Sequence, residues 1–415
     1  MNQNHLVVTG MGAVTPIGIG VESYWNNLIS GVSGVDRIRT FDPSQLPVQI
    51  AAEVKNFDPL DYLPKTLVRA TDRFMQFAMI AAKQALAQSK LEIARDSYRI
   101  GIVMGTAMDG VSCVAQTQHS YSTGAAKKIG PRFVPMVIGN IAAAQVAIEY
   151  GIHGPSFTVN TACSSGGDAI MLAAMLIHSG EADAVLVMGG ESILTPVVVS
   201  SLAQSKALSR CNDDPAAACR PFDADRDGFV IGEGGGAILL EREEYALSRN
   251  AEILARVPGY ANTSDGYHVT APMPDGSGAS RCMRLALQRA GLEPSEIDYI
   301  NAHGTSTLLG DQAETVAIKS VFGGIETAPP VSATKSATGH LMGAGGITEV
   351  IACIQSVREG IIPPTINYHT PDPTCDLDYV PNQARKAKVR CAMSNSLGFG
   401  GQNSSIIISA YGKQP

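Results

Sequence analysis

One cysteine stands where an apolar, strand-like segment is expected to give way to a helix. Cys163 follows such a segment and precedes the small residues 164–167. At a helix N-terminus, unpaired backbone N–H groups and the positive end of the helix dipole favour a thiolate, the nucleophilic form of cysteine. The same N–H groups could receive an oxyanion when the sulfur attacks a carbonyl. The pattern predicts a nucleophilic cysteine with a lowered pKa, the alternative being a small buried apolar residue.

Two histidines have similar surroundings. His303 lies within residues 301–307 and His340 follows residues 335–339, and both segments are rich in small residues and come after an expected strand. In open α/β sheets, binding sites gather at the carboxyl ends of strands. We therefore expect both imidazoles to reach one site, although a structural role is the commoner use of a lone histidine. The other histidines lack this context, and His268 is intermediate.

Two further motifs resemble ligand-binding loops, but each lacks a residue that its ligand would require. Residues 223–228 resemble the start of a calcium loop, but an EF-hand needs Glu at its twelfth position, where this chain has Gly234. Arg226 would also repel a cation, so we expect a buried ion-pair turn. The glycines of residues 232–236 lack the Lys-Ser/Thr that a phosphate-binding loop requires. Phe399, within a late glycine turn, is expected to be an aromatic side chain on a hinge.

Short apolar runs alternate with longer helical patterns, which predicts an α/β protein. The expected strands are nearly all apolar, as is typical of strands buried on both faces. They fall into two series, residues 6–9, 100–104, 157–161, 184–188 and 237–240, then residues 253–257, 297–301, 331–334, 391–394 and 405–409. A helix is expected over residues 72–88 behind a Thr71 cap.

The combination of strand, small-residue turn and glycine-lined helix occurs twice, after residue 157 and again after residue 331. Any α/β protein has several such units, so repetition alone is not decisive. Glycine is disfavoured inside helices, and its presence in both predicts two helices packed very closely. We expect one compact unit with two pseudo-duplicated halves, residues 1–250 carrying the cysteine and residues 251–415 carrying both histidines.

Composition restricts the class of protein. Of 415 residues, 45% are hydrophobic and 17% charged, which excludes intrinsic disorder. The net charge of −7 argues against nucleic-acid or membrane binding. Eight cysteines without a CxxC pair favour a reducing compartment over a zinc or redox site. The N-terminal residues show no secretory signal, and the longest apolar helical run, residues 169–177, is too short for a membrane span. The cytoplasm is the expected location.

Taken in order, these motifs resemble those of the β-ketoacyl-(acyl-carrier-protein) synthases, above all the elongating type II enzymes of bacterial fatty acid synthesis. The motifs are spread over almost the whole chain, at residues 161–165, 221–223, 226–230, 301–305, 335–336, 339–340 and 398–401. The resemblance implies the thiolase fold, a five-layer α-β-α-β-α arrangement of two related halves. It also implies a homodimer, or a heterodimer with a related ketosynthase-like subunit.

The resemblance implies a reaction. Cys163 would take an acyl group from a carrier-protein thioester, a malonyl thioester would lose carbon dioxide, and the resulting enolate would attack the acyl-cysteine. His303 and His340, as neutral imidazoles, would donate Nε2–H bonds to the enolate oxygen. Lys335 would orient the histidines, and the N–H groups of Cys163 and Phe399 would form an oxyanion hole. No cofactor is required, because the substrates arrive as phosphopantetheine thioesters.

Other functional positions of the family also fall on this sequence. They are the pantetheine-binding Thr305 and Thr307, the acyl-pocket residues Met108 and Phe133, and a structural monovalent cation site at Asn301, Glu349, Ser394 and Asn395. Met108 stands where the elongating enzymes usually have a smaller branched residue. A longer, flexible methionine could shorten the acyl pocket or adapt it to an unusual chain, so the acyl chain length stays open.

Basic clusters interrupt an otherwise acidic sequence. They are Lys65, Arg69 and Arg73, then Lys127, Lys128 and Arg132, then Lys206 and Arg210. Acyl carrier proteins are strongly acidic, and a basic rim would steer such a partner to the site. The resemblance therefore implies carrier docking at Lys65, Arg69, Lys127, Lys128 and Lys206, the alternative being ordinary solvated charges.

Other functions remain as alternatives. A ketosynthase subunit of a type II polyketide or polyene synthase would use the same chemistry. A degradative thiolase would carry a second cysteine in the late glycine turn, where this chain has none. A non-catalytic partner subunit resembling a chain-length factor would lack the nucleophile that Cys163 supplies. A cysteine hydrolase would leave His340 unexplained.

Overall fold

Residues 5–412, the part of the chain that the structure describes, contain an eleven-stranded mixed sheet in this computed structural model. Residues 1–4, on which the expected absence of a secretory signal partly rests, lie outside that part. The strands of the first half are β1 (Leu6–Thr15), β2 (Gly18–Ile19), β5 (Ile100–Gly105), β6 (Ser156–Val159), β7 (Ala184–Glu191) and β8 (Gly234–Arg242). Those of the second half are β9 (Ala255–Ser264), β10 (Tyr299–Asn301), β11 (Val331–Ser332), β14 (Cys391–Gly398) and β15 (Gln402–Ser409).

The two halves of the sheet have the same topology. The first runs β6-β5-β7-β8-β1 and the second β11-β10-β14-β15-β9. In each half the first two neighbouring pairs are parallel and the next two antiparallel. The antiparallel pair β1 and β9 joins the halves through Val7↔Arg256 and Val8↔Ala255. This equivalence confirms the predicted pseudo-duplication.

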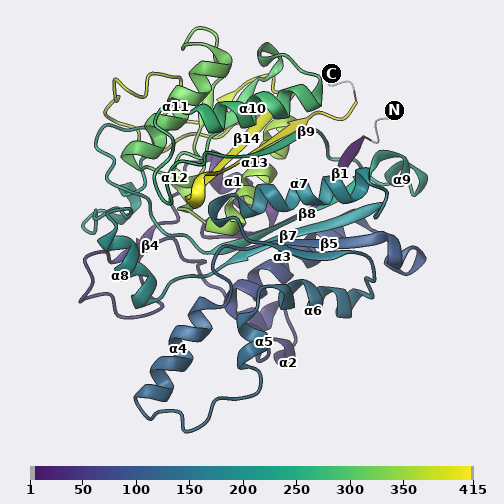
Figure 1. The fold of residues 1–415 in the computed structure, drawn as a ribbon, viewed down its shortest axis with the longest axis vertical. Coiled ribbons are helices and arrows are strands. Elements are labelled where there is room, and N and C mark those ends of the chain that lie inside the picture. The colour runs from purple at the N-terminus through teal and green to yellow at the C-terminus, as the bar shows by residue number, and fades with distance from the viewer. Residues whose placement is uncertain (1–4, 413–415) are drawn as a thin grey trace.

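Helices form three layers around the two halves of the sheet (Figure 1). The outer layers are α3 (Arg73–Ser89) with α6 (Asn140–Tyr150), and α10 (Ser277–Ala290) with α11 (Leu308–Phe322). Between the two half-sheets lie α7 (Ser165–His178) and α13 (Gly345–Glu359). The arrangement is the predicted α-β-α-β-α sandwich.

Shorter elements connect these layers. The remaining helices are α1 (Val21–Ile29), α2 (Lys65–Val68), α4 (Val111–Ser122), α5 (Phe133–Val137), α8 (Pro196–Gln204), α9 (Glu243–Ser248) and α12 (Lys335–Thr338). Two small sheets pair β3 (Asp36–Arg37) with β4 (Ile50–Ala51) and β12 (Ile361–Ile362) with β13 (Arg385–Lys386). Within residues 5–412, no helix combines the length and apolar character needed to cross a membrane.

The central helices α7 and α13 meet at their glycines, as predicted. A Cβ atom on Gly166 would lie 3.0 Å from the carbonyl oxygen of Gly343, and one on Gly346 would lie 2.8 Å from the backbone nitrogen of Gly167. No side chain fits between the two backbones at these points. The N-terminal ends of the two central helices, one from each half, are therefore packed directly against each other.

Two local predictions are wrong. The segment 157–161 was expected as a strand buried on both faces, but β6 is an edge strand and Phe157 is 48% exposed. The apolar residues of this segment lie at an edge of the sheet, and no other strand of residues 5–412 pairs with that edge. Helix α3 is capped by Asp72, whose carboxylate accepts the Arg73 N–H at 2.6 Å, whereas the Thr71 hydroxyl donates to the Leu67 carbonyl.

Candidate active site

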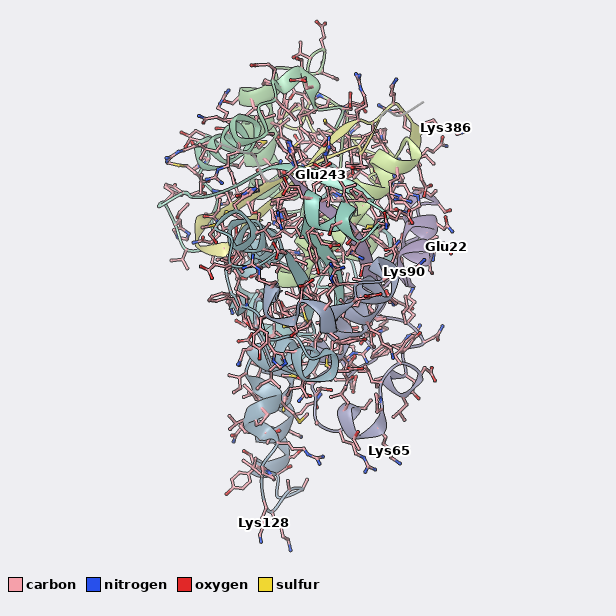
Figure 2. All side chains as sticks on the ribbon, turned by 90° about the vertical axis from the view of Figure 1, so that its right-hand side faces the viewer. Glu22, Lys65, Lys90, Lys128, Glu243 and Lys386 are labelled. Atoms are coloured by element: carbon pink, nitrogen blue, oxygen red, sulfur yellow. The ribbon has the colours of Figure 1, made fainter. Side chains whose placement is uncertain are left out.

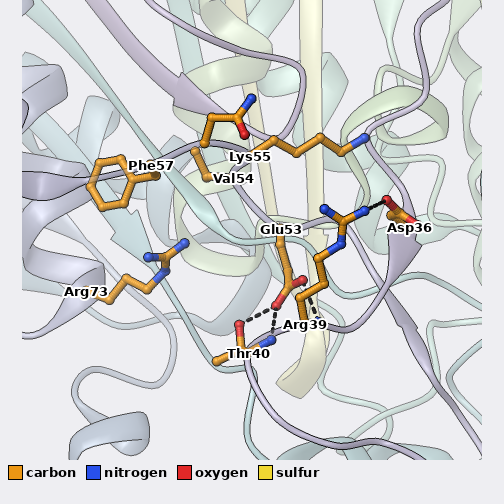
Figure 3. Close-up of a pocket in the computed structure, with 9 residues that line it drawn as sticks. Asp36, Arg39, Thr40, Glu53, Val54, Lys55, Phe57 and Arg73 are labelled. Carbon is orange, nitrogen blue, oxygen red and sulfur yellow. Dashed lines mark hydrogen bonds and ion pairs between the residues drawn. The ribbon is translucent and has the colours of Figure 1, made fainter.

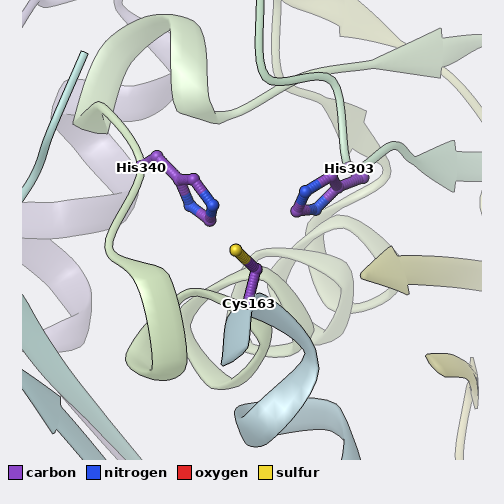
Figure 4. A group of neighbouring side chains, drawn as sticks. All are labelled: Cys163, His303 and His340. Carbon is purple, nitrogen blue, oxygen red and sulfur yellow. The ribbon is translucent and has the colours of Figure 1, made fainter. Parts of the chain in front are cut away.

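Cys163, His303 and His340 meet at the junction of the two halves (Figure 4). One sulfur or ring nitrogen from each residue lies within 4.8 Å of the others. The two imidazole rings are 5.3 Å apart between centroids and nearly perpendicular, at 85°. All three side chains are buried. The structure thus brings together residues that are far apart in the sequence, as predicted from their positions after strands.

The cysteine lies in η4 (Ala162–Ser164), the short 3₁₀ turn that leads into α7. The hairpin between β14 and β15 packs directly on this turn, because a Cβ atom on Gly398 would lie 3.1 Å from the backbone nitrogen of Cys163. The hairpin carries Phe399, whose backbone N–H lowers the pKa of the cysteine thiol, as does the N–H of Cys163 itself. Both expected oxyanion donors thus act on the sulfur electrostatically, and the oxyanion hole stays a prediction.

The predicted low pKa of the cysteine is wrong. Burial raises the pKa of the Cys163 thiol to about 11, and the buried Glu191 carboxylate contributes to the increase. The N–H donors and the Lys335 cation oppose this effect but do not overcome it. Desolvation disfavours the charged form of a buried group, and here it exceeds the stabilisation of the thiolate at the helix terminus. At pH 7 the free thiol carries its proton and must lose it during attack.

This raised pKa predicts how Cys163 is alkylated. Because only the thiolate reacts, the rate with iodoacetamide should increase about tenfold per pH unit from roughly pH 7 to pH 10. Peptide mass spectrometry at each pH measures the modified fraction of Cys163. A rate that levels off below about pH 8 would show a lowered pKa and contradict this expectation.

Both imidazoles are neutral at pH 7. Burial lowers the pKa of His303 and His340 well below its ordinary value, and the nearby Lys335 cation lowers it further. Nδ1 of His340 accepts the Met342 N–H at 3.3 Å, so its proton lies on Nε2. Nε2 of His340 is buried and has no hydrogen-bond partner among residues 5–412, and the same holds for Nδ1 of His303. The site therefore contains a neutral imidazole with a free N–H, as an enolate donor requires.

Backbone contacts orient the two histidines. The carboxylate of Glu314, on α11, accepts the N–H groups of His303 and Gly304, each at 2.8 Å. The His340 N–H donates to the Val230 carbonyl at 2.8 Å, and its ring lies edge-on to Phe229, with centroids 5.4 Å apart. The sequence analysis missed Glu314. The sequence feature that could have indicated Glu314 is its place in the helix after His303, one helical turn beyond the acidic Asp311.

The segment 223–228 is the predicted buried ion-pair turn. Arg226 is buried, with its guanidinium 2.6 Å from Asp372 and 3.5 Å from Asp311. The carboxylate of Asp311 also accepts the N–H groups of Phe222 and Ser306. This network anchors the loop that follows His303 to Phe222 and Arg226 of the first half of the chain.

Lys335 and the candidate cation residues lie beside the histidines. The Lys335 ammonium pairs with Oε1 of Glu349, and both side chains are buried. Oε2 of Glu349 and Oδ1 of Asn301 are buried without a partner among the described residues. Ser394 faces Asn301 in the β10–β14 pairing, and Asn395 follows it. The two free oxygens fit a monovalent cation at Asn301, Glu349, Ser394 and Asn395, and that site stays a prediction.

The remaining predicted residues are only partly brought together. The hydroxyls of Thr305 and Thr307 are 3.0 Å apart. Phe133 lines a cavity of about 260 Å³ with Cys113 and Met136. Met108 does not line that cavity and is 40% exposed. An acyl pocket at Met108 and Phe133 therefore stays a prediction.

The predicted docking residues are exposed. They are Lys65, Arg69, Lys127, Lys128 and Lys206. Figure 2 shows Lys65 and Lys128 at the same end of the molecule. Arg73 is not part of a free basic rim, because its guanidinium binds Glu233 through two nitrogens at 2.9 and 2.6 Å. It lines a separate cavity of about 290 Å³ together with Phe57 (Figure 3).

The fold and site define a condensing enzyme of the thiolase type, and comparison with known proteins agrees. Residues 3–246 match the β-ketoacyl synthase N-terminal domain and residues 254–369 the C-terminal domain. Proteins named 3-oxoacyl-(acyl-carrier-protein) synthase 2 from Coxiella burnetii and Synechocystis are both 43% identical, over 99% of this chain and 99% of each relative. The chain belongs to the β-ketoacyl synthase family, whose members are acyltransferases.

Solved structures of the family superpose closely. The ishigamide ketosynthase/chain length factor has a TM-score of 0.92 at 35% identity, covering 98% of this chain and 99% of that one. A type II polyketide ketosynthase solved with its acyl-carrier protein and a hexaketide has a TM-score of 0.89 at 33% identity, with the same coverage. These similarities confirm the thiolase fold.

Proposed function

We propose that the chain is a β-ketoacyl-(acyl-carrier-protein) synthase that catalyses decarboxylative Claisen condensation in fatty acid chain elongation. The observation that carries this proposal is the buried cluster of Cys163 with two neutral imidazoles, His303 and His340, all within 4.8 Å. A sulfur nucleophile and two uncharged N–H donors supply the groups that the two half-reactions need.

In the first half-reaction the Cys163 sulfur loses its proton and attacks the carbonyl carbon of an acyl thioester. The N–H groups of Cys163 and Phe399 stabilise the negative oxygen. The tetrahedral intermediate then expels the pantetheine thiol, which takes up the proton, and leaves the acyl group on sulfur.

In the second half-reaction the malonyl thioester loses its carboxylate as carbon dioxide. The electron pair of the broken C–C bond moves into an enolate, whose oxygen accepts hydrogen bonds from His303 and His340. The enolate carbon attacks the carbonyl carbon of the acyl-cysteine, the C–S bond breaks, and the sulfur leaves as a thiolate that takes up a proton from solvent. Burial keeps both histidines neutral, and the positive charge of Lys335, held by Glu349, lowers their pKa further. No cofactor takes part.

Type II polyketide elongation is the second candidate, because the ishigamide and hexaketide-bound structures superpose so closely. The two pathways share the condensation chemistry and differ in whether the β-keto group is reduced before the next extension. The presence of Cys163 argues against a non-catalytic subunit in either pathway. For location we propose the cytoplasm, since all eight cysteines are free thiols, as expected in a reducing compartment.

The proposal is tested with acyl carriers of several chain lengths and malonyl carrier protein. A synthase of fatty acid elongation should release carbon dioxide and yield a β-ketoacyl carrier two carbons longer, as measured by mass spectrometry. Products extended several times without reduction would favour the polyketide alternative. Absence of condensation with every carrier would contradict both.

The exposed lysines predict how an acyl carrier docks. Replacing Lys127 and Lys128 by Glu should raise KM for acyl carrier roughly tenfold at low salt and weaken its salt dependence, because steering by opposite charge is lost. Turnover of a small acyl-pantetheine should change little. The control reverses Lys386 and Lys388, which are also exposed; Figure 2 shows Lys386 at the opposite end of the molecule. An equal loss with both substrates would contradict docking.

The free edge of β6 predicts a homodimer. Phe157 is exposed there, as are Ile148 on α6 and Met175 on α7, two helices that contact β6. An uncovered apolar edge strand readily pairs with another strand, so we propose that two copies pair at β6.

Thr158→Pro should remove a β-ladder donor from that edge, reducing the mass in light scattering from twice 43.5 kDa to 43.5 kDa. Ile325→Asp, at an exposed apolar residue outside β6, α6 and α7, should leave the dimer intact. A monomeric unmodified chain would contradict the proposed dimer.

A further inference from the structure

The helix that follows the nucleophile carries a buried carboxylate with no part in the proposed reaction. Asp168, on α7, is 3% exposed. Burial raises its pKa, while hydrogen bonds from neighbouring side chains lower it. A buried carboxylate is costly unless its oxygens are well hydrogen-bonded. The partners of Asp168 therefore indicate what it holds in place.

One oxygen holds the turn that carries the nucleophile. Oδ2 accepts the Thr161 hydroxyl at 2.6 Å and the Ser164 hydroxyl at 2.9 Å. These two residues flank Ala162 and Cys163, and Ala162 has a left-handed backbone with φ of 52°. Such a conformation is unfavourable for alanine and persists only where its surroundings enforce it. Oδ2 fastens both ends of this strained turn.

The other oxygen reaches the second half of the chain. Oδ1 accepts the amide of Asn262 at 2.8 Å, and Asn262 on β9 pairs with Ser404 on β15. β15 begins immediately after the turn that carries Phe399. The turn with Phe399 also packs against the segment that carries Cys163. A Cβ atom on Gly398, just before Phe399, would lie 3.0 Å from the Thr161 carbonyl oxygen. One carboxylate thus connects the two segments that provide the oxyanion donors.

We propose that Asp168 is a positioning residue for acyl transfer, which sets the distance between the N–H groups of Cys163 and Phe399 so that both reach one carbonyl oxygen. The inference rests on the proposed function. Oxyanion donors are effective only when they lie about 2.7–3.1 Å from the developing charge. A displacement of about 1 Å can reduce a rate about a hundredfold, so a residue that touches no substrate can still control acylation.

Asp168→Asn tests this inference with little change in volume, because it replaces one acceptor oxygen by a donor. Acylation of Cys163 should slow by roughly ten- to a hundredfold, with KM for acyl-pantetheine within about twofold, since the substrate contacts are unchanged. The carbonyl stretch of the acyl-enzyme, measured by infrared difference with a ¹³C label, should move to higher wavenumber. Weaker hydrogen bonds to the carbonyl cause that shift, and a purely structural role would not.

Glu241→Gln is the matched control. Glu241 is a buried carboxylate held by Arg249 and Thr9. Its replacement should lower the unfolding temperature while acylation and the carbonyl stretch stay unchanged. Thr161→Val removes only one donor to Asp168 and should reproduce a smaller form of both effects, which keeps the test decisive if the Asp168 variant does not fold.

The inference would be overturned if the Asp168→Asn variant folds and shows the same acylation rate and carbonyl stretch as the unmodified chain. With the Asp168 variant unfolded, an unchanged Thr161→Val would do the same. An unmodified chain that forms no acyl-cysteine would instead overturn the proposed function, so the two failures are distinguishable.

Discussion

Cys163→Ala is expected to abolish acylation of the chain, leaving no adduct in the intact-protein mass spectrum after incubation with acyl carrier. Cys163 is the cysteine whose sulfur faces both imidazoles and two backbone N–H donors. Alanine removes the sulfur and leaves a methyl group in a buried site, so little else should change. Condensation should fall to the background rate, because no acyl group is held for the enolate to attack.

The control for this variant is Cys211→Ala. Cys211 is a half-buried free thiol whose contacts are with Arg220 and Asp214, away from the two histidines. Its replacement should leave acylation complete. An adduct that persists in Cys163→Ala, located by peptide mapping, would assign the nucleophile to another residue and contradict the proposed mechanism.

His303→Ala and His340→Ala should each reduce carbon dioxide release from malonyl carrier by about 10²–10³, the usual effect of removing one donor to a developing oxyanion. Both variants should still form the acyl-cysteine, because the backbone donors of the first half-reaction remain. The neutral state of both rings supports this division of roles, since neither is a cation that could protonate the leaving group at pH 7. Release of carbon dioxide and acylation are measured separately on the same protein.

Two further variants sharpen the histidine test. His303→Asn and His340→Asn retain an N–H donor and should keep more decarboxylation than the alanine variants. His153→Ala, at an exposed histidine stacked on Tyr98, should keep full activity. Full decarboxylation by either active-site alanine variant would remove that histidine from the proposed mechanism.

Local patterns were sufficient to predict which three side chains lie together and to predict the duplicated α/β architecture. The positions of Cys163, His303 and His340 after expected strands predicted that they would meet, and the structure places them together. The glycines of α7 and α13 predicted the close contact of the two helices. These inferences succeeded because strand ends, helix starts and glycine positions depend on residues near in sequence, and sheet topology then brings the ends of equivalent strands together.

Only the tertiary structure decided the properties that depend on burial and on distant partners. The helix terminus predicted a lowered thiol pKa, yet desolvation raises it to about 11, because the folded chain buries Cys163. The apolar β6 segment predicted a buried strand, yet it is an exposed edge. Asp168 drew no attention in the sequence because its partner Asn262 lies 94 residues away. Solvent exclusion and hydrogen bonds between the halves are set by the folded chain as a whole, so no local pattern of residues contains them.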